Sequence, residues 1–258
     1  MSPDRPLLFI PTYNESENVV KILDEVLAQD LGLDVLFLDD NSPDGTGAIL
    51  DGLAAKQPAV SVIHRGGKEG IGTAHKAGIR WAYERGYSTL ITMDCDFSHQ
   101  PKYLGDFLRN ATECAVVVGS RHLEPEGLED WDLPRYCLTK ISHFVTEHVL
   151  GLPYDATNAY RLYNLTLIPP GIFDLVQSKS YSFFFESLFI LHVNAMSIKE
   201  IPVNILMRTR GQTKMTISDV WRSVRTVLVL GANWWREPRR FLLPKQASLK
   251  FPARSNDI

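Results

Sequence analysis

Apolar and polar positions alternate between two periods along the first half of the chain. Short runs of consecutive apolar residues are typical of strands buried on both faces, and longer stretches repeat apolar residues every three or four positions, as amphipathic helices do. The runs predict strands at residues 7–10, 35–38, 60–64, 89–93 and 115–119. The stretches between them predict helices at residues 16–29, 44–56, 73–84 and 102–110. This strict alternation predicts an α/β fold with a doubly wound, mostly parallel sheet.

The alternation fades beyond residue 119. Residues 124–132 are acidic and indicate a loop, and residues 138–150 indicate a helix. Residues 181–192 are strongly aromatic and apolar. A layer packed beside the first half of the chain would account for these segments.

The end of the chain combines an apolar face with a basic one. The clearest boundary lies near Met215, so we expect a main domain over residues 1–215 and a tail over residues 216–258. On a helix over residues 218–236, one face carries Val220, Trp221, Val224, Val227, Leu228, Gly231, Trp234 and Trp235. The opposite face carries Asp219, Arg222, Arg225, Asn233 and Arg236. Such a helix is typical of a bilayer interface, and the alternative is a helix that packs on the main domain or docks on a membrane partner subunit.

Composition narrows the class of protein. The chain has 258 residues, of which 45% are hydrophobic and 22% charged, so it can bury the core of one α/β domain. The net charge of -3 hides a local concentration of basic residues, since residues 208–240 contain eight Arg or Lys and only two acidic residues. We expect no nucleic-acid partner. Three cysteines without metal-type spacing indicate a reducing compartment. We find no signal-type apolar region at the N-terminus and no run of about 18 apolar residues that would span a membrane.

Two aspartates follow the predicted strand at residues 89–93. The sequence MDCDFSHQP at residues 93–101 holds Asp94 and Asp96 one residue apart. In open α/β sheets ligands bind at the carboxyl ends of the strands, and two hard oxygen donors there suit a divalent cation that holds a diphosphate. The pair therefore indicates a nucleotide substrate, and the alternative is a solvated turn.

Two further loops open on the same edge of the predicted sheet. In PTYNE at residues 11–15, Tyr13 could stack on a base and Glu15 could accept from ribose hydroxyls. DDNSPDGT at residues 39–46 starts with two carboxylates that repel one another and persist best where a base, a ribose or a metal supplies a partner. The alternative in both loops is a polar turn whose side chains cap the next helix. The glycine-rich stretch at residues 65–72 lacks the Gly-Lys-Ser/Thr of a phosphate loop and indicates a flexible connection.

The acidic side chains of these loops and the ring of Tyr13 are expected to converge on one ligand, because the carboxyl ends of parallel strands share one edge of the sheet. The converging set is Tyr13, Glu15, Asp39, Asp40, Asp94 and Asp96.

Basic residues follow the last predicted strand of the first half. Arg121 ends that strand, and Arg135 comes after the acidic loop. Guanidinium groups favour phosphate oxygens, so two of them beside a diphosphate site would hold a second phosphate. A salt bridge to Glu126, Glu129 or Asp130 is the alternative. The basic loop RTRGQTK at residues 208–214 would close over the first ligand's phosphates or form a solvated surface.

In this order along the chain, the acidic and basic blocks resemble those of family 2 glycosyltransferases of GT-A fold. Within that family the closest resemblance is to the dolichol-phosphate or polyprenol-monophosphate mannosyltransferases, and it covers roughly residues 7–215. DATNAYR at residues 155–161 belongs to the same pattern. The resemblance implies a GDP-mannose donor, a Mg²⁺ or Mn²⁺ ion and a polyprenyl phosphate acceptor.

The resemblance also implies roles for individual residues. The residues expected to contact the nucleoside are Pro11, Tyr13, Glu15, Leu38 and Asp40. Asp94 and Asp96 would bind the metal and the diphosphate, Cys95 would also contact the donor, and Ser98 would lie near the ion. Arg208 and Lys214 would bind the donor phosphates, and Arg121 and Arg135 would bind the lipid phosphate.

The implied reaction needs no dedicated base. A phosphate monoester has a second pKa of ~6, so its oxygen is already an anionic nucleophile in the cytoplasm. A single displacement would invert the anomeric carbon. We expect a cytoplasmic enzyme that associates peripherally with the membrane. Two alternatives stay open: a family member that uses a UDP-sugar or a soluble saccharide acceptor, and a non-catalytic regulatory subunit of the same fold.

Overall fold

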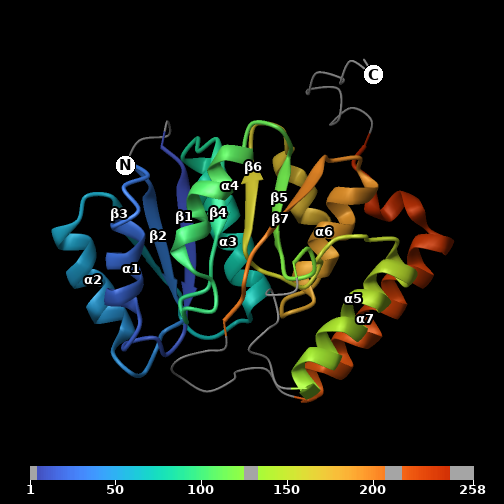
Figure 1. Cartoon of the computed structure of the whole chain (residues 1–258), viewed down its shortest axis with the longest axis horizontal. Helices are drawn as coiled ribbons and strands as arrows, with labels where there is room; N and C mark the ends of the chain where they lie inside the picture. Colours follow the sequence, from blue (N-terminus) through green and yellow to red (C-terminus); the bar gives the residue numbers. More distant parts are fainter. Residues whose placement is uncertain (1–4, 125–132, 207–216, 245–258) are drawn as a thin grey trace.

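A seven-stranded sheet forms the centre of the molecule (Figure 1). The structure, a computed structural model, describes residues 5–124, 133–206 and 217–244, without the side chains of residues 134, 135 and 217–221. The strands are β1 (Leu7–Thr12), β2 (Asp34–Asp39), β3 (Val60–His64), β4 (Thr89–Thr92), β5 (Val116–Ser120), β6 (Arg161–Asn164) and β7 (Ile198–Pro202). Their order is β3-β2-β1-β4-β6-β5-β7, and only β6 runs antiparallel to its neighbours. The prediction of a mostly parallel α/β sheet is confirmed.

Helices cover both faces of the sheet. The first face carries α1 (Val19–Leu27), α2 (Thr46–Lys56) and α4 (Leu104–Asn110), which follows the short helix η1 (Pro101–Tyr103). The second face carries α3 (Ile71–Glu84), η3 (Pro170–Leu175), α6 (Phe183–Val193) and η4 (Pro238–Phe241). Two long helices, α5 (Leu133–Leu150) and α7 (Ile217–Arg236), lie side by side beyond α6 (Figure 1). The result is a three-layer α/β/α arrangement.

The direction of the chain reverses between β1 and β4. From β1 the chain moves outward through β2 and β3, and α3 then returns it to the other side of β1. Because crossovers are right-handed, the helix of the return step lies on the opposite face from α1 and α2. Ligands of open α/β sheets bind outside the carboxyl ends of the strands at such a reversal. We call this side of the sheet the C-terminal edge; the antiparallel β6 starts there.

The alternating first half was predicted more completely than the second half, in which the expected helix at residues 138–150 is present within α5. All five predicted strands and four predicted helices are present; β3 has the predicted ends, and the ends of the others are shifted. The predicted helix at residues 16–29 begins later, because Asn14 adopts a left-handed φ of 55° and the carbonyl of Glu15 accepts from the N–H groups of Asn18 and Val19 in a turn. Strands β6 and β7 were missed. The apolar segment predicted as a separate layer forms α6, which shares one core with α3 on the second face.

The apolar face predicted for the tail helix divides in the structure. Val227 is buried, and Trp234 packs edge-to-face on Phe189 with ring centroids 5.6 Å apart. At Gly231 an added Cβ would lie 2.9 Å from a methyl group of Val149, so the glycine permits the close approach of α7 to α5. The exposed part of that face comprises Val224, Leu228 and Trp235. Among the described residues, no helix is both long and apolar enough to cross a bilayer.

Candidate active site

The loop after β1 is tied to the start of α2. Tyr13 is half-buried, and the ammonium of Lys68 lies 4.5 Å from the centroid of its ring. Glu15 is buried, accepts a hydrogen bond of 2.7 Å from the amide of Asn18, and donates its backbone N–H to the Thr46 hydroxyl at 2.9 Å. This loop therefore lies directly beside the loop after β2.

Two residues assigned to the nucleoside belong to the strands themselves. Pro11 pairs with Leu38 in the β1–β2 ladder. The side chain of Leu38 is fully buried in the core on the second face, so only its backbone is left for a ligand. Its carbonyl accepts from the Thr12 hydroxyl at 3.2 Å.

Hydroxyl and amide groups hold the carboxylates of the loop after β2. Asp39 accepts from the Ser42 hydroxyl at 2.5 Å and from its N–H at 3.1 Å. Asp44 accepts from Thr46, at 2.6 Å from the hydroxyl and 3.1 Å from the N–H, and from the Ser16 N–H at 3.0 Å. Burial works against the charged form, but these hydrogen bonds outweigh it and lower the pKa of Asp44 to about 2. A polar turn precedes α2, but the N-cap of this helix is Gly45, with a left-handed φ of 88°, and no side chain makes a cap hydrogen bond, so the expected capping by a side chain of this loop is wrong.

Asp40 has a partner that the sequence did not suggest. Arg65, which follows β3, donates to both carboxylate oxygens of Asp40 at 2.5 and 2.6 Å and to the Thr73 hydroxyl at 2.6 Å. Burial, together with the nearby charges of Asp39 and Glu69, nevertheless raises the pKa of Asp40. The pair was predictable only from the sheet order, since β3 and β2 are neighbours whose ends share the C-terminal edge.

The loop after β4 differs between its two aspartates. The side chain of Asp94 is 33% exposed, whereas Asp96 is buried. Asp96 accepts from the hydroxyl of Ser98 at 2.6 Å and from its N–H at 3.0 Å. Phe97, between them, has a left-handed φ of 62°, a strained conformation that bends the loop back on itself. Cys95 is buried in the core of the first face, so its thiol lies away from the edge.

A histidine and an asparagine join this loop to β5. The N–H of Asp94 donates to Nδ1 of His99 at 2.9 Å, and Nε2 of His99 lies 3.0 Å from Oδ1 of Asn158. The amide of Asn158 donates to the carbonyl of Gly119, in β5, at 2.6 Å. The sequence blocks at residues 93–101 and 155–161 contained both residues, but nothing in their spacing assigned them a role.

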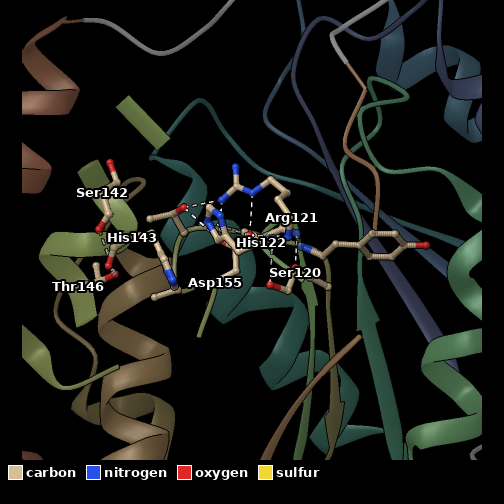
Figure 2. Close-up of polar contacts among 12 residues, drawn as sticks. Ser120, Arg121, His122, Ser142, His143, Thr146 and Asp155 are labelled. Atoms are coloured by element: carbon tan, nitrogen blue, oxygen red, sulfur yellow. Dashed lines mark hydrogen bonds and ion pairs between the residues drawn. The ribbon is translucent and has the colours of Figure 1, made fainter. Parts of the chain in front are cut away.

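Arg121 is fixed by a buried carboxylate (Figure 2). Its N–H, Nε and Nη2 donate to Asp155 at 3.1, 2.7 and 2.6 Å, and Nη2 also donates to Thr157 at 2.6 Å. Burial alone would raise the pKa of Asp155, but the charge and hydrogen bonds of Arg121 hold that pKa well below its ordinary value. Figure 2 shows the remaining terminal nitrogen of Arg121 directed away from Asp155. Asp155 in turn donates its N–H to Glu200 of β7 at 2.7 Å.

Two histidines extend this cluster toward α5. The ring of His122 stacks on that of His143, with centroids 4.2 Å apart and planes 20° from parallel. Burial lowers the pKa of His122 to about 4, although the charge of Asp155 acts in the opposite direction. The stack connects the residue after Arg121 to the helix that also carries Arg135.

Three predicted basic residues cannot be placed against this geometry. Arg135 lies near the start of α5, with its side chain outside the described part. Arg208 and Lys214 lie outside the described residues altogether. The described residues hold no cluster of three or more His, Cys, Asp or Glu positioned for a metal ion.

The fold is shared with a solved structure. The crystal structure of residues 1–349 of S. aureus TarS in complex with UDP-GlcNAc superposes with a TM-score of 0.55, at 14% identity over 87% of this chain and 66% of that chain. The likeness defines the fold, a GT-A glycosyltransferase fold. Residues 8–171, more than half of the chain, match the family model described as glycosyl transferase family 2. The chain belongs to this family, and it is an enzyme of the glycosyltransferase class.

Two curated relatives match almost the full chain. An undecaprenyl-phosphate mannosyltransferase of Micrococcus luteus is 36% identical over 233 residues, which are 89% of this chain and 96% of the relative. A polyprenol monophosphomannose synthase of Mycolicibacterium smegmatis is 36% identical over 233 residues, 89% of this chain and 86% of the relative. The family prediction made from the acidic and basic blocks is confirmed.

Proposed function

We propose that the protein transfers mannose from GDP-mannose to a polyprenyl phosphate. The names of both curated relatives combine mannose with a lipid phosphate of this type. The observation that carries the proposal is the fixed guanidinium of Arg121 at the same edge as Asp94 and Asp96. It supports a site with two phosphate positions, one for a metal-bound diphosphate and one for an acceptor phosphate. The choice of GDP-mannose rests on the resemblance of the acidic blocks.

On the donor side, the loops after β1, β2 and β4 would hold the nucleotide. Tyr13 offers a ring for the base, and Glu15 and Asp40 offer oxygens for the base or ribose. The two carboxylates of Asp94 and Asp96 suit Mg²⁺ or Mn²⁺, because such ions are bound by one or two carboxylates and complete their shell with phosphate oxygens. Ser98 would orient Asp96 through its hydroxyl. When bound, the ion offsets the charge of the departing nucleoside diphosphate.

On the acceptor side, Arg121 would bind the lipid phosphate, with Arg135 as its predicted second ligand. A guanidinium held in one orientation loses little freedom when it binds a phosphate, which favours a defined approach to the sugar. The phosphate oxygen is anionic at neutral pH and attacks the anomeric carbon without a base. One displacement then gives inversion.

The acceptor also requires a route to the membrane. Withdrawing an isoprenoid chain from the bilayer costs about 0.8 kcal/mol for each CH₂-sized group, so the enzyme must reach the lipid. Helices α5 and α7 carry exposed apolar side chains at Leu133, Ile141, Phe144, Leu228 and Trp235. They also carry exposed basic residues at Lys140, Arg222, Arg225 and Arg236. This combination suits peripheral binding to anionic lipid at the cytoplasmic face, and docking on a membrane partner subunit is the alternative.

Liposome flotation tests the membrane surface. Deleting the tail would expose the core, because Val227 and Trp234 are packed inside, so substitutions on the surface are the sharper test. Ile141→Ser with Phe144→Ser should weaken flotation with anionic liposomes. Val20→Ser, on the exposed side of α1, is the matched control and should float like the wild type. Failure of the intact protein to float at low and at high salt would favour the partner subunit.

A substrate panel tests the reaction. The protein is incubated with radiolabelled GDP-mannose or UDP-sugars and with polyprenyl phosphates or soluble saccharides. Label should enter the lipid phase only from GDP-mannose. Arg121→Ala should raise the KM for lipid phosphate and leave nucleotide affinity nearly unchanged. Transfer from a UDP-sugar alone, or to a soluble saccharide alone, would contradict the proposal.

A further inference from the structure

The two halves of the site meet through a strand that runs the other way. Strand β4 ends at the predicted donor side and β5 at the predicted acceptor side, but these strands are not neighbours, because β6 lies between them. Since β6 is antiparallel to both, the segment that leads into β6 arrives at the C-terminal edge. We call residues 155–160 the bridging segment. Its contacts decide how the donor side and the acceptor side are spaced.

Asn158 is the residue of the bridging segment whose side chain makes hydrogen bonds to both halves; Tyr160 also contacts both, through its carbonyl to the Gly119 N–H and through its hydroxyl to the carbonyl of Gln100. Its Oδ1 accepts from His99 at 3.0 Å and from the N–H of Tyr160 at 3.2 Å, and its Nδ2 donates to the carbonyl of Gly119 at 2.6 Å. Two N–H groups therefore point at its carbonyl oxygen and one carbonyl oxygen at its amide nitrogen, which fixes the orientation of the side chain. Asn158 is 4% exposed, so these bonds form away from solvent.

His99 completes the connection to Asp94. The N–H of Asp94 donates to Nδ1, so Nδ1 carries no proton and Nε2–H is the donor to Asn158. The ring also stacks on Tyr160, with centroids 4.9 Å apart and planes 22° from parallel. The hydrogen-bonded path thus runs from Asp94 through His99 and Asn158 to Gly119, two residues before Arg121.

We propose that His99 and Asn158 are positioning residues that set the spacing between Asp94 and Arg121, and with it the spacing between the donor sugar and the acceptor phosphate. The inference rests on the proposed function. Displacement requires the reacting atoms to lie about 3–3.5 Å apart, and a misplacement of about 1 Å can cost a hundredfold in rate. We call the hydrogen-bonded path through His99 and Asn158 the bridge. A change in the bridge should affect kcat more than the binding of either substrate, because each substrate keeps its own contacts.

Asn158→Asp breaks one arm of the bridge. The carboxylate keeps an oxygen for His99 and Tyr160 but turns its second oxygen toward the carbonyl of Gly119, which repels it. We expect kcat for mannosyl transfer to fall by about tenfold or more, with nucleotide affinity and the KM for lipid phosphate changed far less. His99→Phe breaks the other arm, keeps the stacking on Tyr160, and should give the same split.

Asn164, at the opposite edge of the sheet, is the matched control. Its Nδ2 donates to the carbonyl of Ala111 at 3.0 Å, and its Oδ1 accepts from the N–H of Thr166 at 3.1 Å. A related pattern of bonds therefore occurs far from the active site, on a side chain that is only partly buried. Asn164→Asp should lower thermal stability less than Asn158→Asp does and leave kcat at the wild-type value.

A double-mutant cycle decides between a bridge and two independent defects. If His99 and Asn158 act as one unit, His99→Phe combined with Asn158→Ala should lower kcat no further than either change alone. Should Asn158→Asp fail to fold, this cycle carries the test. Additive losses, or equal kcat values for Asn158→Asp and Asn164→Asp in an active wild-type background, would overturn the bridge. A wild-type enzyme without transfer to polyprenyl phosphate would instead overturn the proposed function.

Discussion

On the donor side of the C-terminal edge, Asp96 is held by the hydroxyl and N–H of Ser98, whereas on the acceptor side Asp155 is held by the guanidinium of Arg121. Hydroxyl and N–H donors orient a carboxylate without cancelling its negative charge. A guanidinium cancels the charge, and the carboxylate then serves to fix the arginine. The comparison teaches that the same residue type, at the same edge, can be held in two electrostatically different ways, which fits the proposed metal site on one side and the proposed phosphate site on the other.

The donor side also contains an Asp–Arg pair, and it behaves differently. Burial raises the pKa of Asp40 despite Arg65, with Asp39 and Glu69 adding repulsion, whereas the pKa of Asp155 is held low by Arg121. Asp155 is therefore a stable counter-ion. The Asp40–Arg65 pair is less favourable, which suits a contact that opens when a ligand supplies donors of its own.

The largest expected effect concerns the carboxylate of Asp96. Asp96→Ala should lower kcat by at least about a hundredfold, because the departing diphosphate loses a stabilising group that acts at the reacting centre. Initial rates at saturating metal and substrate measure it. Asp106→Ala, an exposed aspartate of α4, is the control and should keep the wild-type rate. Full turnover in excess EDTA, or a wild-type rate for Asp96→Ala, would contradict the proposed metal site.

The next effect concerns the acceptor-side pair. Asp155→Asn leaves a buried guanidinium without its counter-ion, and removal of one partner from such a pair typically costs about 3–5 kcal/mol. Urea denaturation should show this loss in the free energy of unfolding. Arg121 would lose its fixed orientation, so the KM for lipid phosphate should rise as well. A loss below about 1 kcal/mol would show that Asp155 is no essential counter-ion.

A smaller effect is expected for the donor-side pair. Asp40→Asn should cost roughly 1–2 kcal/mol of unfolding free energy, less than Asp155→Asn, because Arg65 keeps its bond to Thr73. The raised pKa of Asp40 means that its ionised form opposes folding above the folded-state pKa. Wild-type protein should therefore lose less stability than Asp40→Asn as the pH falls through that value. Equal losses of unfolding free energy for Asp40→Asn and Asp155→Asn at pH 7 would contradict the difference inferred between the two Asp–Arg pairs.

The smallest expected effect concerns how the free energy of unfolding depends on pH through His122 and Asp155. Burial lowers the pKa of His122 to about 4 from an unfolded value of about 6.5, so its contribution to stability is complete above pH ~6.5 and is lost as the pH falls toward 4. Asp155, whose folded pKa is lowered, loses its contribution only below about pH 4. His122→Phe keeps a ring against His143 and should reduce the loss of unfolding free energy between pH 7.5 and 6 by roughly 1 kcal/mol. His148→Phe, on an exposed face of α5, is the control; an unchanged slope for His122→Phe would contradict the assignment.

Local pattern was sufficient for the strands and for the residues that follow them. Asp94 and Asp96 were placed at a strand end because the apolar run before them is unambiguous, and Arg121 was placed in the same way. Their partners were not predictable. Arg65 and Asp40 are 25 residues apart, Arg121 and Asp155 are 34 apart, and His99 and Asn158 are 59 apart, so each pair forms only through the strand order.

Two residues that the resemblance assigned to the donor have buried side chains. Cys95 and Leu38 stand beside donor residues in sequence, but side chains alternate between the two faces of a strand and its extension, and both are buried in the core. Strand β6 escaped prediction because a strand of four residues with a charged first position carries no periodic signal. In contrast, α6 escaped because a helix that is apolar all round has no polar face to reveal its period.

The position of β6 has a consequence for synthesis of the chain. Strands β1 to β4 can pair as they emerge, but β5 pairs only with β6 and β7, which are made later. Until residue 164 leaves the ribosome, β5 has no partner strand and one side of β4 is an open edge. Open apolar strands recruit other chains, so a nascent or truncated protein that ends before β6 should aggregate. The strand that lies between the two proposed halves of the active site is thus also the one that decides when the sheet can close.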